Sequence, residues 1–262
     1  MKIVQKIMTE NPCYKTGEKI KVKGLMLHSV GCPQPKASVF IKNWNRASFD
    51  RACVHDFIDA YDGIVYQTLP WDHRGWHCGG AGNNGYIGVE MCEPSCITYT
   101  GGAGFTCSNE AEARAMVKRA YESAAELFAY LCRAYGLDPL KDGVILSHKE
   151  GCARGIASNH GDPEHLWNGL HTEYTMAGFR KAVGSRLGKE VKQEIFKPYL
   201  VQVKVHDLNI RKGPGMNYPR TGRYTGAGVF TIVDESAGTG ASRWGKLKSG
   251  AGWIALDYAK RV

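Results

Sequence analysis

The chain has 262 residues, of which 43% are hydrophobic and 23% charged, a composition typical of globular proteins and unlike that of a disordered chain. No apolar run approaches the ~18 residues that a membrane-spanning helix needs, and the first residues lack the apolar segment of a secretion signal. We therefore predict a soluble protein that is made in the cytoplasm without a signal peptide and does not insert into a membrane.

Positive charge is concentrated in the last quarter of the chain. The formal net charge is +9, and residues 189–262 carry 13 Lys and Arg against 6 Asp and Glu, whereas residues 1–188 carry 21 against 19. A basic tail suits an anionic polymer such as nucleic acid, membrane headgroups or an acidic cell wall. Nucleic acid is disfavoured because the tail has no RNA-binding or helix-turn-helix pattern.

Nine cysteines all precede residue 153, and their odd number excludes complete pairing within the chain. Without an export signal they are predicted to be thiols in a reducing compartment. None shows the C-x-x-C spacing of a structural zinc knuckle. Most are therefore expected to be small buried apolar residues.

The large N-terminal part is predicted to be α/β. A long helix is expected to begin after Asn109, which forms a capping box with Glu112, and to end at Gly136. Shorter helices are expected at 37–46 and 172–183. Short β-branched or apolar runs predict strands at 23–30, 54–59, 63–69, 86–92 and 143–148. This pattern predicts a mixed β-sheet flanked by helices.

The tail has a different pattern, and a charged stretch separates it from the large part. We predict a domain at 1–184, a linker at 185–197 and a second domain at 198–262. Within the second domain, glycine-rich and polar segments separate short runs that predict a small all-β barrel, with strands at 201–205, 208–211, 229–233, 243–249 and 252–258.

Three residues have the chemistry of an open zinc site. His28 and His148 each end a predicted strand, where side chains reach the cleft above a sheet, and Asp162 follows across a glycine-rich loop. Two imidazoles and one carboxylate bind Zn²⁺ and leave a fourth position for water. In the alternative interpretation Asp162 only caps a helix that begins at Pro163.

Glu90 is a carboxylate within an apolar strand run, where an unpaired charge is costly. A position facing a zinc-activated water would explain it, because a carboxylate there acts as the general base of metal-assisted hydrolysis. The alternative is a structural ion pair with a neighbouring Arg or Lys.

Several motifs resemble a known family. GLMLHSVG, GIVYQTLPWDHRGWHCGG, YIGVEMCEP and SHKEGCARGIASNHGDPEHLW are similar, in order and spacing, to the zinc-dependent N-acetylmuramoyl-L-alanine amidases of the peptidoglycan-recognition and phage-lysozyme type (amidase type 2), over roughly residues 20–180. LNIRKGPGMNYPRTG and GWIALDYAKRV in the tail resemble a bacterial SH3 cell-wall-binding domain. Together they resemble a phage endolysin.

The resemblance implies a set of roles. His28, His148 and Asp162 match the family's zinc ligands, and Glu90 matches the catalytic glutamate. His160 occupies the position of the Lys or Thr that stabilises the oxyanion, so its identity departs from the family. The family's Tyr-His pair on the second strand also departs, because it is Val54–His55 here.

The implied reaction cleaves the amide between the lactyl group of N-acetylmuramic acid and L-alanine, with bacterial peptidoglycan as the partner and the cell wall as the place of action. The candidates for substrate binding are His55, Trp71, Trp76 and His77, although loop aromatics often simply pack. The candidates for wall binding are Trp244, Trp253 and Tyr258, although a small barrel needs aromatics for its own core.

Two other functions remain open at this point. One is a recognition protein that binds peptidoglycan without cutting it; the presence of Asp162 disfavours this, because non-catalytic relatives typically lose the third ligand. The other is a zinc peptidase that cuts the stem peptide or the cross-bridge with the same site. The sequence leaves the host, the cross-bridge specificity and the oligomeric state undetermined.

Overall fold

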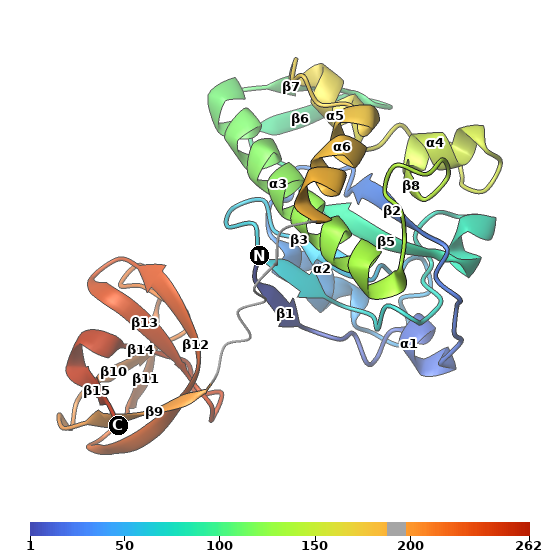
Figure 1. Ribbon diagram of the computed structural model, residues 1–262. Helices are drawn as coiled ribbons and strands as arrows, with labels where there is room; N and C mark the ends of the chain where they lie inside the picture. Colours follow the sequence, from blue (N-terminus) through green and yellow to red (C-terminus); the bar gives the residue numbers. More distant parts are fainter. Residues whose placement is uncertain (188–197) are drawn as a thin grey trace. The chain divides into compact units, whose positions relative to one another are not determined.

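The computed structural model describes residues 1–187 and 198–262. The chain divides into two compact units, Met1–Gln193 and Glu194–Val262 (Figure 1). Residues 185–187 of the predicted linker belong to helix α6 (Met176–Leu187), and the rest of the linker lies outside the described residues. Among the described helices, none is both long and apolar enough to cross a membrane.

A mixed six-stranded sheet forms the centre of the first unit, as the sequence predicts. Every neighbouring pair is parallel except β3 and β4. The five predicted strands are present with shorter ends, and β1 adds a strand that was not predicted. The strand order is β1 (Ile3–Gln5), β4 (Val65–Gln67), β3 (Asp56–Ile58), β5 (Tyr86–Met91), β2 (Gly24–Ser29) and β8 (Ile145–Ser147).

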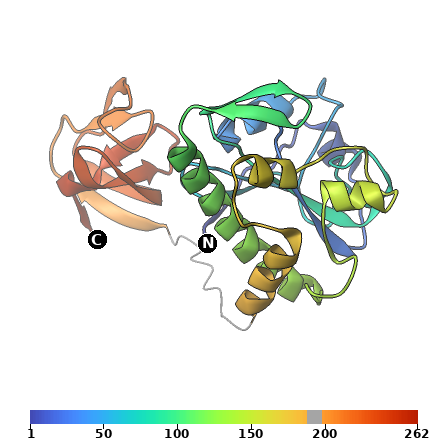
Figure 2. The ribbon, with the colours of Figure 1, turned by 90° about the horizontal axis from the view of Figure 1, so that it is seen from above.

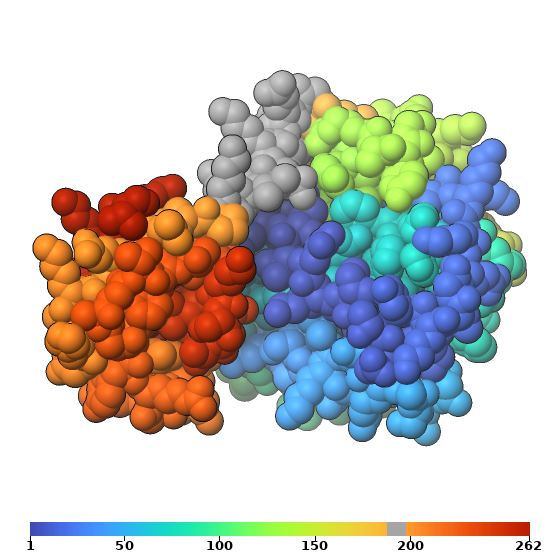
Figure 3. Space-filling model, turned by 90° about the horizontal axis from the view of Figure 1, so that it is seen from below, coloured from blue at the N-terminus to red at the C-terminus, as the bar shows by residue number. Residues whose placement is uncertain are grey.

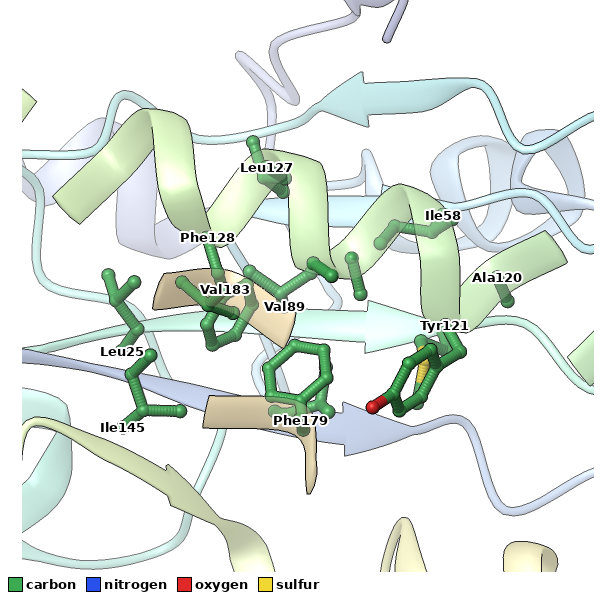
Figure 4. Packing of buried hydrophobic residues seen from close by; sticks show 14 of the residues in the cluster. Leu25, Ile58, Val89, Ala120, Tyr121, Leu127, Phe128, Ile145, Phe179 and Val183 are labelled. Carbon is green, nitrogen blue, oxygen red and sulfur yellow. The ribbon is translucent and has the colours of Figure 1, made fainter. Parts of the chain in front are cut away.

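The long helix α3 (Glu110–Tyr135) covers one face of this sheet, with α6 beside it (Figure 2). The predicted cap is present, because Asn109 Oδ1 accepts a hydrogen bond from the Glu112 amide at 3.2 Å. Gly136 ends the helix in the left-handed conformation, with φ 64°. Leu127 and Phe128 are fully buried against the sheet, and Phe128 meets Phe179 of α6 with ring centroids 5.1 Å apart (Figure 4).

Helix α2 (Ala37–Trp44) packs on the sheet through Phe40, whose ring stacks on Phe57 at 5.2 Å. The N-terminal segments, drawn in blue, form much of one face of the first unit (Figure 3). The hairpin of β6 (Ile97–Gly101) and β7 (Gly104–Cys107) was not predicted, because its alternation is short and glycine-rich. The remaining elements are α1 (Pro12–Thr16), η1 (Ala81–Asn84), α4 (His148–Ala153) and α5 (Glu164–Gly169).

The second unit is a small all-β domain in which every pairing is antiparallel. Segment 234–238, predicted as loop, continues a strand because its backbone pairs across a hairpin while its polar side chains stay at the surface. Two strands, β11 and β15, were not predicted. The order is β11 (Arg220–Tyr224), β10 (Asn209–Arg211), β14 (Trp253–Ala255), β13 (Ala241–Leu247), β12 (Gly228–Gly238), β9 (Tyr199–Val203) and β15 (Ala259–Arg261); η2 is Leu256–Tyr258.

Candidate active site

Strand register brings two of the predicted residues side by side. His28 on β2 is the direct register partner of Glu90 on β5. Because side chains alternate along a strand, Leu25 and Leu27 face α3, and His28 lies on the opposite face. His148 is the first residue of α4 rather than the end of a strand, since Ser147 caps that helix through its side chain.

The structure brings His28, His148 and Asp162 together. The Nδ1 atoms of His28 and His148 are 3.0 Å apart, and the two rings are nearly perpendicular at 88°. Asp162 Oδ2 is 3.2 Å from His28 Nδ1, and Asp162 Oδ1 is 3.5 Å from His148 Nδ1. All three side chains are buried, so the cluster is a defined polar site inside the unit.

Asp162 is not the cap of the helix that follows it. Helix α5 begins at Glu164 after Pro163, and no side chain caps it. Instead, Asp162 Oδ2 accepts a hydrogen bond from the Ser29 amide at 3.3 Å. Burial tends to raise the pKa of Asp162, but its close contacts with the His28 and His148 imidazoles lower it overall. The carboxylate is therefore the stable form at the site.

The donor set fits a zinc ion. One ligand atom from each residue lies within 4.8 Å of the others, and two imidazoles with one carboxylate form a common three-ligand set that leaves an open position. Burial, followed by the neighbouring His28, lowers the pKa of His148 to about 4, which keeps that imidazole neutral. Neutral imidazoles and an ionised carboxylate are the forms that bind metal.

Glu90 lies next to this cluster without a counter-ion. Its Oε2 is buried and has no hydrogen-bond partner within the described ranges, and none of the ion pairs described there involves it. Burial raises the pKa of Glu90 well above its ordinary value, and the Asp162 and Glu93 charges raise it further. The structural ion pair that was the alternative is therefore not found. A carboxyl group with a raised pKa is suited to proton transfer.

His160 extends the cluster toward solvent. It is exposed, and its ring centroid is 4.6 Å from that of His148. His160 Nδ1 is 3.0 Å from Ser158 Oγ. A cavity of about 540 Å³ connects these residues, and its lining includes Glu90, His148, His160 and Asp162. Its volume is that of a small-molecule or peptide site.

Of the four predicted substrate-binding residues, only His77 reaches this cavity. Trp71 packs against Tyr130 and donates its indole hydrogen to Asp56 Oδ2 at 2.8 Å. Trp76 is 49% exposed and borders a different cavity. His55 is fully buried under the strands, where burial lowers its pKa to about 4.

The sequence analysis missed two residues that line the cavity, Tyr99 and His165, and a buried acid that contacts Tyr99, Glu93. The hydroxyl of Tyr99, on the unpredicted hairpin, lies 2.7 Å from both Glu93 Oε2 and His165 Nε2. Glu93 is fully buried, and burial raises its pKa. The sequence could have indicated Glu93, because it is a second acidic residue only three positions after Glu90. No sequence signal placed Tyr99 or His165, because both reach the cavity through tertiary packing.

The fold has counterparts among solved structures. It is similar to the Staphylococcus aureus hydrolase AmiA, solved in complex with its ligand, with a TM-score of 0.55 and 18% identity over 71% of this chain and 83% of that chain. It is also similar to the solution structure of the PlyG catalytic domain, with a TM-score of 0.50 and 16% identity over 73% of this chain and 99% of that one. At such low identity these likenesses concern the fold alone.

The sequence gives a closer relationship. A curated relative, N-acetylmuramoyl-L-alanine amidase CwlH of Bacillus subtilis (strain 168), is 41% identical over 58 residues, which span 21% of this chain and 21% of CwlH. Residues 18–165, more than half of the chain, match the family described as N-acetylmuramoyl-L-alanine amidase, and they include His28, Glu90, His148 and Asp162. The chain therefore belongs to the N-acetylmuramoyl-L-alanine amidase family.

Proposed function

We propose that this protein is a zinc-dependent N-acetylmuramoyl-L-alanine amidase that cleaves the lactyl-L-alanine amide of bacterial peptidoglycan and acts as a cell-wall lytic endolysin. The observation that carries the proposal is the buried cluster of His28, His148 and Asp162 with the unpaired Glu90 beside it. Family membership supplies the reaction class, and the cluster supplies the groups that this reaction needs.

The proposed division of labour follows from the donor chemistry. His28, His148 and Asp162 would hold Zn²⁺, which when bound polarises a carbonyl group and lowers the pKa of water to near 7. Glu90 takes the proton of the attacking water and delivers it to the departing L-alanine nitrogen. Its raised pKa suits both steps, because the carboxyl group must accept a proton and then release it.

His160 is proposed to stabilise the oxyanion. It lines the same cavity as Glu90 and Asp162, and it is exposed enough to meet a substrate. An imidazole N–H of His160 would donate the hydrogen bond that Lys or Thr donates at this position in the amidases that the sequence resembles. The expected contribution is a hydrogen bond that strengthens as charge develops on the carbonyl oxygen.

The second unit is proposed to be an SH3-like domain that holds the enzyme on the wall. A cavity of about 280 Å³ is lined by two of the predicted wall-binding aromatics, Trp244 and Tyr258. Tyr258 is 60% exposed, whereas Trp244 is buried and its indole nitrogen has no partner within the described ranges. Trp253 does not line this cavity. An exposed aromatic ring at the edge of a small cavity suits a short peptide ligand.

The decisive experiment is mass spectrometry of peptidoglycan digested with the purified protein. An amidase releases new L-alanine amino termini and intact glycan strands, and chelator treatment followed by Zn²⁺ should remove and restore the activity. Other free amino groups would instead indicate a peptidase that cuts the stem or cross-bridge. Binding to walls with no new termini would indicate a non-catalytic recognition protein.

A further inference from the structure

His77 is held rigidly behind the metal-facing cluster. It follows β4 and precedes η1, and its amide donates to Asn83 Oδ1 at 2.9 Å. Its ring lies over Gly88 of β5. A Cβ atom on residue 88 would be only 2.3 Å from Cγ of the His77 ring. Only glycine at position 88 leaves room for this ring, and His77 as a residue is 8% exposed. The imidazole therefore has one available position.

The hydrogen bonds of His77 determine which nitrogen carries its hydrogen. His77 Nε2 lies 3.0 Å from the carbonyl oxygen of Tyr86, and a carbonyl only accepts, so Nε2 donates. Within the described residues, the ring makes its hydrogen bonds with that carbonyl and with His28 Nε2, and a single ring hydrogen, on Nε2, is consistent with both. His77 Nδ1 is consequently an acceptor.

The same reasoning then fixes His28. His77 Nδ1 is 3.0 Å from His28 Nε2, so the hydrogen on that pair belongs to His28 Nε2. The other nitrogen of His28, Nδ1, is the one that faces His148 and Asp162. The hydrogen bond to His77 therefore keeps the hydrogen of His28 on Nε2. The lone pair of His28 Nδ1 is then available to bind a cation.

The second metal-facing histidine, His148, is held by a hydroxyl group instead of an imidazole. Its Nε2, the nitrogen that faces away from Asp162, is 3.1 Å from Ser158 Oγ. The Ser158 hydroxyl can accept from that nitrogen while donating to His160 Nδ1 at 3.0 Å. The Ser158 amide in turn donates to the carbonyl of Cys78, the residue after His77, at 2.7 Å. One short segment, His77–Cys78, is therefore connected to both metal-facing imidazoles.

We propose that His77 and Ser158 are positioning residues: each fixes the tautomer and ring orientation of one metal-facing histidine, and the His77–Cys78 segment is their common anchor. The inference rests on the proposed zinc site and deepens it. It assigns His77 to metal affinity rather than to substrate binding. Loss of such a support typically weakens metal binding 10- to 100-fold.

The test is the Zn²⁺ affinity of the full-length protein, measured by competition with a chromophoric chelator. His77→Leu removes the acceptor and should weaken Zn²⁺ binding roughly 10- to 100-fold. His77→Asn keeps an acceptor near the position of Nδ1, although it loses the donor to the Tyr86 carbonyl, and should recover most of the affinity. His206→Leu, which removes an exposed imidazole far along the chain, is the matched control and should match the wild type.

Ser158 provides an independent arm of the test. Ser158→Ala should weaken Zn²⁺ binding less than His77→Leu, because Ser158 is only partly buried and water can replace its hydroxyl. Ser158→Thr keeps the hydroxyl and should bind as the wild type does.

The outcomes separate this inference from the proposed function. A wild-type protein that binds no Zn²⁺ overturns the metal site itself, whereas a wild type that binds and a His77→Leu variant of equal affinity overturn only the positioning role. If His77→Leu fails to fold, ¹⁵N NMR of the zinc-loaded wild type replaces it. We expect His28 to carry hydrogen on Nε2, and hydrogen on Nδ1 instead would contradict the inference.

Discussion

The two units bury different kinds of side chain. Among the described residues, every buried polar or charged side chain belongs to the first unit except Arg211, and the core of the second unit is otherwise aliphatic with one tryptophan. Burying a titratable group costs stability unless it is paired. The first unit retains several around one cavity, which indicates chemistry, whereas the second presents aromatic surface, which is sufficient for binding.

The largest effect is expected from removing the carboxylate that is proposed to bind the metal in the first unit. Asp162→Ala should weaken Zn²⁺ binding more than about 100-fold, beyond the effect of losing a supporting residue, and should abolish wall lysis. Asp142→Ala, which removes an exposed carboxylate that pairs with Arg154, is the control. Metal content and turbidity loss of a wall suspension are the measurements. Retained zinc and lysis would remove Asp162 from the site.

A second test separates metal binding from proton transfer. Glu90→Gln should leave Zn²⁺ affinity unchanged and lower kcat by roughly 10²- to 10⁴-fold, because the amide cannot carry the proton. Release of L-alanine amino termini from soluble muropeptides measures this loss. Glu173→Gln, at an exposed position, should have no effect. Normal turnover in Glu90→Gln would show that another group moves the proton.

A third test addresses the second unit. Tyr258→Ala should weaken binding to whole walls roughly 5-fold, about 1 kcal/mol, while activity on soluble muropeptides stays unchanged. Tyr224→Ala removes a comparably exposed ring that does not line the cavity, and it is the matched control. Co-sedimentation with purified walls gives the affinities. Equal losses in both variants would mean that the cavity is not the wall-binding surface.

The smallest expected effect concerns a buried acid outside the cavity. Burial raises the pKa of Asp56 to about 8, although the Trp71 indole hydrogen bond opposes this. Above the ordinary aspartate pKa of about 4, the folded protein keeps a proton that the unfolded chain releases, so stability should fall as pH rises from about 4 to about 8.

Asp56→Asn removes that titration and keeps an oxygen for the Trp71 indole. The free energy of unfolding of the first unit, from urea titrations at pH 5 and pH 8, should therefore vary less with pH in Asp56→Asn than in the wild type. An unchanged pH dependence would show that Asp56 is ionised in the folded protein.

How much the sequence determined depends on the range of the interactions. The capping box at Asn109, the apolar face of α3 and the β-branched runs act over a few residues, so the elements of the mixed sheet were predictable. Motif order and spacing likewise identified His28, Glu90, His148 and Asp162 as candidates. The ends of strands, the β6–β7 hairpin and strand β11 were missed, because cross-strand pairing decides them rather than local propensity.

Only the tertiary structure decided the surroundings of those candidates. Sequence analysis named His77 as a candidate for substrate binding together with Trp71, and the structure adds that a glycine on β5 leaves room for its imidazole, which lies within hydrogen-bonding distance of His28 and of a carbonyl on the same strand. Tyr99 and His165 meet across 66 positions of sequence. Hydrogen bonds of this kind depend on distances between elements remote in the chain, and such distances are set when the sheet, helices and loops pack.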